Sequence, residues 1–246
     1  MKNLGLVWAL TLFGLSTTAT AETPWLDLLK ESNLKAFKPN RAKEGDYLWA
    51  EAVQLDEKSM KTILATGRGA ILVNGTKGRS PDLYTVNEYG DLEVEVEFMI
   101  AKGSNSGIKF HGWYEVQILD TFASKKLSGD SMGGIYPRAE DKPSYHHIDD
   151  GIPPRVNAAK PAGEWNKLTV IFLAPRFEAQ GKKIANAKIV KAILNEQLIH
   201  ENQEMKTPTG SNWNKAERAK GPFMLQMDHG PVAFRQVRIR EYSAGK

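Results

Sequence analysis

The segment from Asn105 to Asp120 constrains the fold most, because it predicts two short strands joined by a tight turn. Apolar and polar residues alternate on both sides of that turn, which is the pattern of a strand with one buried face. This alternation would place Lys109, Glu115 and Gln117 together on the face turned away from the core. The segment therefore predicts a polar surface on an otherwise apolar sheet.

The length of the turn decides which residues face each other. A two-residue turn would pair Phe110 with Glu115 and mix the two faces, which a half-buried sheet does not tolerate. A three-residue turn at 111–113 brings the apolar side chains to one face and makes Lys109 and Glu115 cross-strand neighbours. The predicted pairs are Phe110 with Tyr114, Lys109 with Glu115, and Ile108 with Val116.

Strand signals continue along most of the chain. The cleanest lies at Leu92 to Phe98, where apolar residues alternate with Glu93, Glu95 and Glu97. Such a pattern is typical of a strand with one solvated face. We interpret the three glutamates as that face rather than as a catalytic cluster.

Further strands are predicted towards the end of the chain. Asn195-Glu196 predicts a hairpin between the strands at 188–194 and 197–200. Segments 223–227 and 232–240 are predicted to form the last strand pair. The final strand changes its apolar phase, which indicates a bulge near Arg235 and Gln236.

Many short strands with little helix predict an all-β domain built as a sandwich of two antiparallel sheets. The best helical stretch after the N-terminal segment lies at 25–37, so we expect a short N-terminal helix packed on this domain. The domain is predicted to cover residues 22–246 as a single unit.

The first 21 residues predict a secretory signal. Lys2 precedes an apolar run from Leu4 to Leu15, and Ala19-Thr20-Ala21 forms an A-x-A cleavage site. The run is shorter than the roughly 20 residues of a spanning helix, so we expect no stable membrane insertion. We therefore expect cleavage after Ala21 and a periplasmic or extracellular protein.

Composition excludes several classes of chemistry. The chain has no Cys, so it has no thiol nucleophile, disulfide or thiolate metal site. Its formal net charge is +4, and no basic run with interleaved aromatics occurs, so we expect no nucleic-acid partner.

The regular pattern stops between Gly129 and Pro161. Repeated Gly and Pro interrupt this stretch, which also holds many polar residues. Long ordered loops in compact domains usually carry function. We expect this loop to lie across the sheet face and to form one wall of a cleft.

Short phrases spread over the chain resemble the 3-keto-disaccharide hydrolase family. The phrases are Gly103-Ser-Asn-Ser-Gly-Ile, Tyr114-Glu-Val-Gln-Ile-Leu-Asp120, Gly134-Ile-Tyr136, Asn157-Ala-Ala-Lys-Pro161, Gly163-Glu-Trp-Asn166, Leu225-Gln226, Asp228-His-Gly-Pro-Val232 and Phe234-Arg-Gln-Val-Arg-Ile239. The resemblance implies a concanavalin A-like jelly roll, an exported bacterial protein, and action on sugars oxidised at C3. The segments 175–187 and 138–155 depart from the family pattern and bear on the substrate more than on the fold.

A ketone at C3 of a glycoside acidifies the hydrogen at C2. A base that removes this hydrogen expels the C1 oxygen by β-elimination, and water then adds to the enone. The site needs a base, a group that stabilises the enolate, and a proton donor. We assign Glu115 as the base and Lys109 as its partner or the enolate stabiliser. His146 is a catalytic candidate because a histidine suits the role of proton donor, but the sequence leaves open which histidine donates.

Other residues are candidates for contact with an oxidised glycoside or disaccharide. Trp113, at the predicted turn, would stack on a sugar ring. For several of the others, a purely structural role is an equal alternative. The full set of binding candidates is Gln117, His111, Trp113, Asp120, His147, Asn157, Lys160, His229 and Arg235.

The sequence does not require a metal. His146-His147-Ile-Asp149-Asp150 holds residues able to bind one, but adjacent His residues on an extended loop point apart. If a divalent metal is used, calcium held by Asp oxygens fits this segment better than zinc.

Two alternatives stay open from the sequence. One is a sugar-binding module without turnover, since sandwiches serve binding as readily as catalysis. The other is a conventional two-carboxylate glycoside hydrolase, in which Asp120 would be the second carboxylate. Without a bulge, however, Asp120 lies on the opposite face of the strand from Glu115.

Overall fold

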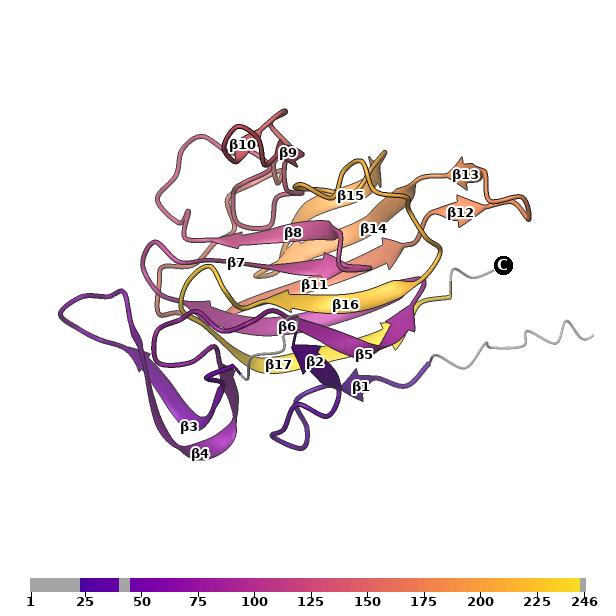
Figure 1. Cartoon of the computed structure of the whole chain (residues 1–246). Helices are drawn as coiled ribbons and strands as arrows, with labels where there is room; N and C mark the ends of the chain where they lie inside the picture. The colour runs from indigo at the N-terminus through magenta and orange to yellow at the C-terminus, as the bar shows by residue number, and fades with distance from the viewer. Residues whose placement is uncertain (1–22, 40–44, 244–246) are drawn as a thin grey trace, which may run out of the picture.

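Two antiparallel sheets packed face to face make up most of the computed structural model, which describes residues 23–39 and 45–243 (Figure 1). The larger sheet has eight strands, with β1 (Leu26–Asp27) pairing β17 outside the main order. The main order is β15 (Gln197–Met205), β14 (Ala187–Leu194), β11 (Asn166–Leu173), β6 (Leu92–Ile100), β17 (Val232–Glu241), β4 (Ile63–Val73), β3 (Leu48–Leu55).

The smaller sheet carries the hairpin singled out in the sequence. Its order is β2 (Phe37–Pro39), β5 (Leu83–Tyr89), β16 (Gly221–Gln226), β7 (Asn105–Phe110), β8 (Tyr114–Leu119). Two small hairpins complete the described structure: β9 (Ala139–Glu140) with β10 (His146–His147), and β12 (Arg176–Phe177) with β13 (Lys183–Ala185). This arrangement is an all-β jelly-roll sandwich, as predicted.

The predicted register of β7 and β8 is confirmed. Lys109 faces Glu115, Phe110 faces Tyr114, and the turn between them has three residues. His111 and Gly112 in that turn adopt positive φ values of 54° and 72°, the left-handed backbone that a tight turn requires. The alternation therefore places one set of side chains in the core and the other on the outer face.

The core lies between the two sheets and is rich in aromatic rings. Phe110 of β7 stacks on Phe172 of β11 with ring centroids 4.5 Å apart, and both side chains are fully buried. Phe223 of β16 meets Phe110 edge to face. These rings hold the small sheet against the large one, and so they support the strands of the candidate site.

The glutamates of β6 form a charged outer face, as interpreted from the sequence. Each one pairs with a cation on a neighbouring strand: Glu93 with Arg240, Glu95 with Arg238 and Lys167, and Glu97 with Arg235. The predicted bulge is also confirmed, because the register of β17 shifts between Phe234 and Gln236.

The prediction of an N-terminal helix is wrong. This segment forms β1, a series of turns and then β2. Asp27 and Asn33 accept hydrogen bonds from the backbone N–H groups two residues ahead, and Ser32 adopts φ of 48°. Side chains that bond their own backbone in this way compete with a helix. The apolar spacing instead buries Leu28 and Leu29 against the core.

The predicted last strand pair is also wrong, because β16 and β17 lie in different sheets. The chain crosses between the sheets at 227–232. The Asn74 side chain ties this crossing down by donating to the carbonyls of Met227 and Gly230 and accepting from the N–H of Val232. The hairpin between β14 and β15 forms as predicted, with Asn195 and Glu196 at positive φ.

The predicted signal segment, residues 1–21, lies outside the described residues and stays a prediction. Within 23–39 and 45–243, no helix has the length and apolarity needed to cross a membrane.

The stacked rings predict a large cost for a change at Phe110. Phe110→Ala removes a fully buried ring, so the free energy of unfolding should fall by about 3–5 kcal/mol. Urea unfolding followed by tryptophan fluorescence measures this. Phe122→Ala is the matched control, because Phe122 is half exposed and its loss should cost no more than about 0.5 kcal/mol.

Candidate functional site

The candidate site lies on the outer face of the small sheet. Strand pairing sets its floor: Glu115 of β8 faces Lys109 of β7, which in turn faces Met224 of β16. One row further, Gly107 faces Gln226 of β16. These neighbours come from three strands and show why the site required the tertiary pairing of β16 with β7.

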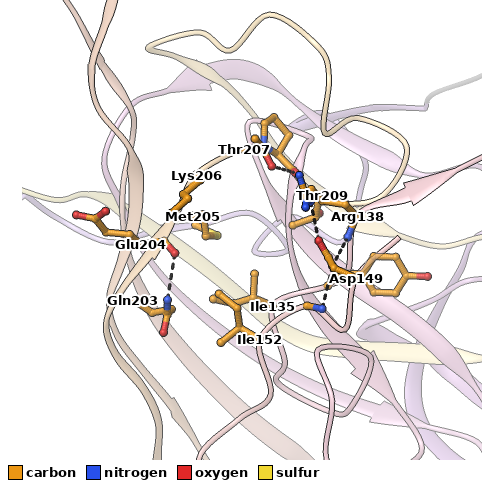
Figure 2. A pocket seen from close by; sticks show the side chains of 13 residues that line it. Ile135, Arg138, Asp149, Ile152, Gln203, Glu204, Met205, Lys206, Thr207 and Thr209 are labelled. Carbon is orange, nitrogen blue, oxygen red and sulfur yellow. Dashed lines mark hydrogen bonds and ion pairs between the residues drawn. The ribbon is translucent and has the colours of Figure 1, made fainter. Parts of the chain in front are cut away.

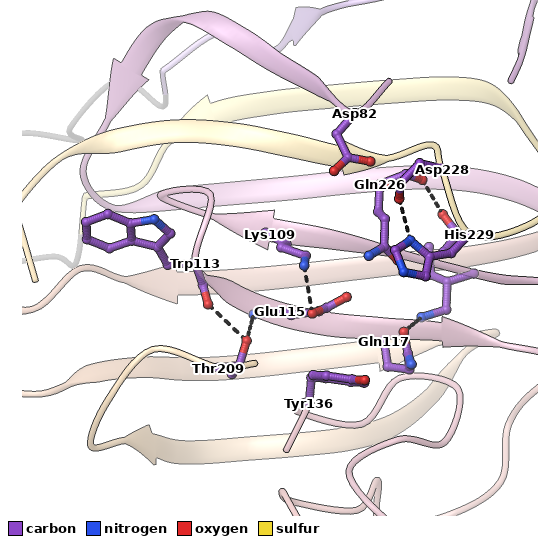
Figure 3. Close-up of polar contacts among 12 residues, drawn as sticks. Asp82, Lys109, Trp113, Glu115, Gln117, Tyr136, Thr209, Gln226, Asp228 and His229 are labelled. Carbon is purple, nitrogen blue, oxygen red and sulfur yellow. Dashed lines mark hydrogen bonds and ion pairs between the residues drawn. The ribbon is translucent and has the colours of Figure 1, made fainter. Parts of the chain in front are cut away.

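Lys109 and Glu115 form a buried ion pair at the centre of this floor (Figure 3). Lys109 Nζ lies 3.0 Å from Glu115 Oε2, and only 15% and 4% of the two side chains are exposed. Burial by itself lowers the pKa of Lys109, but the charge and hydrogen bond of Glu115 outweigh it and raise the pKa above its ordinary value. Lys109 is therefore a fixed cation beside the carboxylate.

The backbone of Glu115 is held by Thr209 from a neighbouring loop. Thr209 Oγ1 accepts the N–H of Glu115 at 3.1 Å and donates to the Trp113 carbonyl at 2.9 Å. This hydroxyl ties the loop at 205–212 to the strand that carries the carboxylate.

Gly107 makes room for the carboxylate. A Cβ placed at this position would lie 2.5 Å from Glu115 Oε1, closer than carbon and oxygen can approach without displacement. The glycine sits diagonally across from Glu115 on the neighbouring strand. Any side chain here would push the carboxylate away from its present position.

A cavity of about 350 Å³ opens over the ion pair. Tyr136 and Tyr145 form one wall, so the loop predicted to cover the sheet does contribute to a cleft. The lining residues are Asn105, Lys109, Glu115, Tyr136, Tyr145, Gly210, Ser211, Asn212, Gln226 and His229. The volume falls within the range of small-molecule sites.

Two buried oxygens at this cavity lack a hydrogen-bond donor among the described residues: Oδ1 of Asn105 and Oε1 of Gln226. Buried polar atoms in folded proteins are nearly always satisfied, so each exception asks for an explanation.

Three acidic and basic side chains lie near the cavity, just before β5 and in the loop after β16. Asp82 Oδ1 accepts the N–H of Met227 at 2.8 Å. Asp228 bonds Nδ1 of His229, which lines the cavity. Burial, followed by the neighbouring Asp228, raises the pKa of Asp82 to about 6. The hydrogen bond that the His229 ring donates to the Asp228 carboxylate raises the pKa of His229.

Gln117 lies on the same face but is engaged elsewhere. Its Nε2 donates to Asp130 Oδ1 at 2.6 Å, and the side chain is fully buried. The structure therefore places Gln117 beneath the loop that follows β8 rather than in the lining of the cavity.

Among the predicted site residues, the cavity brings together Lys109, Glu115 and His229. It does not bring His146, which is exposed and directs Nδ1 to the Ser144 carbonyl. His147 contacts the Tyr136 hydroxyl at 2.9 Å from outside the cavity.

The other predicted binding residues hold the fold together in this structure. His111 is buried against Tyr114 and Phe172, and burial lowers its pKa. Trp113 stacks under the Arg218 guanidinium. The remaining four bond within the protein: Asp120 to the Gly103 N–H, Asn157 to the carbonyls of 121, 122 and 124, Lys160 to the Trp165 carbonyl, and Arg235 to Glu97.

Sequence reasoning missed Asn105, Gln226, Tyr136 and Tyr145 as cavity residues. Asn105 could have been predicted from the sequence, because it is an even number of residues from Lys109 along β7 and must lie on the same face. Gln226 could not, since its position depends on the pairing of β16 with β7.

A second cavity, of about 380 Å³, shares Tyr136 in its lining with the first. Figure 2 shows this cavity from close by. Ile135, Ile152 and Met205 give it apolar walls. Arg138 and Asp149, which also line it, neutralise one another at 2.6 Å. The smaller cavity holds the buried Lys109–Glu115 pair and is the better candidate for chemistry.

No group of three or more His, Cys, Asp or Glu side chains within 23–39 and 45–243 is arranged to hold a metal ion. Asp149 of the predicted metal segment accepts the Arg138 and Gly151 N–H groups instead.

A jelly-roll sandwich with a polar cavity on one sheet is an architecture suited to carbohydrates. Residues 24–240 match the family described as the 3-keto-alpha-glucoside-1,2-lyase-like domain, and the chain belongs to that family. It is accordingly a carbohydrate-active, glycosidase-like protein. No curated protein matches the sequence.

Solved structures support the fold. Three proposed glycosyl hydrolases from Parabacteroides distasonis ATCC 8503 are similar to this chain and cover 89% of it in each case. Their TM-scores are 0.63, 0.52 and 0.50, their identities 22%, 19% and 16%, and the shares of their own chains covered 84%, 100% and 94%.

The raised pKa of Asp82 predicts a pH-dependent cost. From an ordinary value of 3.8 the pKa rises to about 6, so the folded protein holds this proton more tightly than the unfolded chain. The contribution of Asp82 to the free energy of unfolding is fully present below pH 3.8 and is lost as the pH rises through about 6.

Asp82→Asn should therefore unfold with a higher free energy than the unchanged protein at pH 7.5, by up to about 3 kcal/mol. The difference should vanish near pH 3.5, where both side chains are neutral. Urea unfolding at the two pH values tests this, and an equal difference at both would contradict the assignment.

Proposed function

We propose that this protein cleaves 3-keto-glycosides by elimination across C1 and C2, followed by hydration. The observation that carries the proposal is the buried Lys109–Glu115 pair at the floor of a polar cavity. The family to which the chain belongs supports the 3-keto sugar as substrate class.

Glu115 acts as the base in this proposal. Lys109 beside it favours the ionised carboxylate, and the room left by Gly107 lets Oε1 face the substrate. The Lys109 ammonium lies 3.0 Å from the Glu115 carboxylate. The two groups can therefore act on C2 and on the C3 oxygen, which are close together in the substrate. Glu115 takes the hydrogen from C2 while Lys109 stabilises the enolate oxygen at C3.

His229 is the proton donor that the geometry favours over His146. It lines the cavity, and Asp228 raises the pKa of its imidazole, so the ring holds its proton at higher pH than an isolated histidine. The imidazolium gives this proton to the C1 oxygen as the C1–O bond breaks. The products of this half-reaction are the free alcohol and an enone.

The hydration step returns His229 and Glu115 to their starting protonation states. Neutral His229 takes a proton from water as the water oxygen adds to C1, and Glu115 returns its proton to C2. The sum is one glycoside and one water converted into a 3-keto sugar and an alcohol. Asn105 and Gln226 would accept hydrogen bonds from ring hydroxyls during these steps.

A conventional double displacement receives less support. It needs two carboxyl groups about 5 to 5.5 Å apart across the glycosidic bond. Among the described residues that line the cavity, Glu115 carries the only carboxylate. Asp120, the earlier second candidate, accepts the Gly103 N–H at 2.8 Å and does not line the cavity.

Glu115→Gln tests the base directly. The amide keeps the size of the side chain but cannot take a proton, so turnover of a 3-keto-disaccharide should fall by about 100-fold or more. Steady-state kinetics on the purified protein measures this. Glu201→Gln is the control, since Glu201 is an exposed residue paired with Arg155 in the large sheet. A Glu115→Gln rate within a few-fold of normal would remove Glu115 from the mechanism.

Substrate oxidation separates the three candidate functions. Elimination requires the C3 ketone, so a 3-keto-disaccharide should be cleaved while its unoxidised parent is untouched, and in deuterated water the product should carry deuterium at C2. Mass spectrometry and NMR of the product read this, with an incubation lacking protein to correct for spontaneous exchange. Cleavage of the parent at a similar rate would point to a two-carboxylate hydrolase, and binding without cleavage would point to a sugar-binding module.

A further inference from the structure

We propose that the second cavity binds the aglycone of the 3-keto-glycoside, and that the preferred aglycone is an uncharged group with an apolar surface, such as an aryl ring. The inference rests on the proposed function, because the aglycone is the alcohol that leaves C1 in that reaction. The family description names a glucoside and leaves its aglycone open.

Strand pairing places Tyr136 on the side of Glu115 that is opposite Lys109. Val116 of β8 bridges Ile135 in the antiparallel sense. The N–H of Tyr136 donates to the Glu115 carbonyl at 3.2 Å, as this register requires. Residues paired in this way carry their side chains on the same face, and Tyr136 lines the same cavity as Glu115. The row across the sheet therefore runs Lys109, Glu115, Tyr136.

This row has the same order as the substrate atoms in the proposed reaction. Lys109 stabilises the oxygen at C3, and Glu115 takes the hydrogen from C2. Since C1 follows C2 in the sugar ring, C1 and the aglycone attached to it lie towards Tyr136.

The second cavity begins where this row continues past Tyr136, because Tyr136 lines both cavities. Ile135 bridges Val116 on one side and Ile152 on the other, and Ile152 lines the second cavity but not the first. The loop at 205–212 also joins the two spaces, since Thr209 lines the second cavity and Gly210 lines the first. A substituent on C1 that extends along the row therefore enters the second cavity.

The polar side chains that line the second cavity are largely bonded within the protein, whereas Ile135, Ile152 and Met205 give it aliphatic walls (Figure 2). The bonds are those of Arg138 with Asp149 at 2.6 Å, Gln203 with the Glu204 carbonyl at 3.1 Å, Thr207 with the Pro208 carbonyl at 3.0 Å, and Thr209 with the Trp113 carbonyl at 2.9 Å.

Two further charged residues of the lining, Glu204 and Lys206, are exposed. Glu204 and Met205 are consecutive in β15, so their side chains leave opposite faces of the strand, and Met205 is the buried one. Glu204 also accepts a hydrogen bond from Asn186 at 3.3 Å. A second sugar would bury hydroxyl groups against aliphatic walls, which costs free energy, whereas an apolar group would not.

Binding to Glu115→Gln measures this preference separately from bond breaking, because phenol leaves more readily than methanol. Isothermal titration calorimetry should give phenyl 3-keto-glucoside a Kd about 10-fold or more below that of methyl 3-keto-glucoside. The phenyl compound should also bind more tightly than a 3-keto-disaccharide. A phenyl compound that binds no more tightly than either of the other two overturns the proposal.

Ile152→Trp, added to Glu115→Gln, tests the location by filling the second cavity. It should raise the Kd of the phenyl compound by about 10-fold and leave the Kd of the methyl compound unchanged. Val156→Trp is the matched control, because Val156 lies four residues on, is 39% exposed and lines neither cavity. An equal loss for both compounds, or no loss for either, overturns the proposal.

The methyl NMR signal of Met205 in Glu115→Gln gives a reading that does not depend on the folding of Ile152→Trp. A bound aryl ring should shift this signal, and the methyl compound should leave it in place. An unmoved Met205 signal at saturation with the phenyl compound overturns the proposal.

Turnover by the unchanged protein separates this inference from the proposed function. If the phenyl compound shifts Met205 but no 3-keto-glycoside is cleaved, the site for the apolar group is supported and the proposed function fails. If 3-keto-glycosides are cleaved and Met205 does not respond to the phenyl compound, the aglycone site fails and the proposed function stands.

Discussion

The Lys109–Glu115 ion pair is the interaction on which the rest of the site depends. Both charges are taken out of water, so each is tolerable only because the other lies 3.0 Å away. A slip of β8 by one residue would turn Glu115 into the core and leave Lys109 without a partner. Removing one partner of such a pair typically costs about 3–5 kcal/mol. The register of the β7–β8 hairpin therefore also determines which side chains form the floor of the cavity.

Both outer faces of the sandwich carry ion pairs between glutamate and a basic residue, but the surroundings of these pairs differ. On the large sheet, Arg235, Arg238 and Arg240 neutralise the glutamates of β6 in pairs whose burial increases from Arg235, 45% exposed, to Arg240, 18% exposed. On the small sheet a single pair lies under a cavity, with two orphaned oxygens nearby. The cavity above the pair, rather than charge, distinguishes the candidate site from the charged face of the large sheet.

Local alternation predicted the hairpin and its pairs because β7 and β8 are adjacent in sequence and their parity has one solution. It failed where local bonds or distant pairings decide the outcome. The N-terminal segment has helical spacing, but Asp27 and Asn33 bond their own backbone. The segment after β16 changes sheets because Asn74, more than 150 residues away along the chain, holds the crossing. The pairing of β16 with β7, which is also distant in sequence, places Gln226 beside Gly107. His146 lies on an exposed loop and does not line the cavity.

Gly107 has a consequence for how this site can vary. The space between β7 and β8 holds one long side chain, and Glu115 occupies it. A larger residue at 107 fits only if the residue at 115 becomes shorter, so the two positions can change together but not one at a time. Exchanging them, with the carboxylate carried by β7 and the glycine by β8, would keep the volume and move the base to the other side of Lys109. Gly107 thus determines on which side of Lys109 the catalytic base lies.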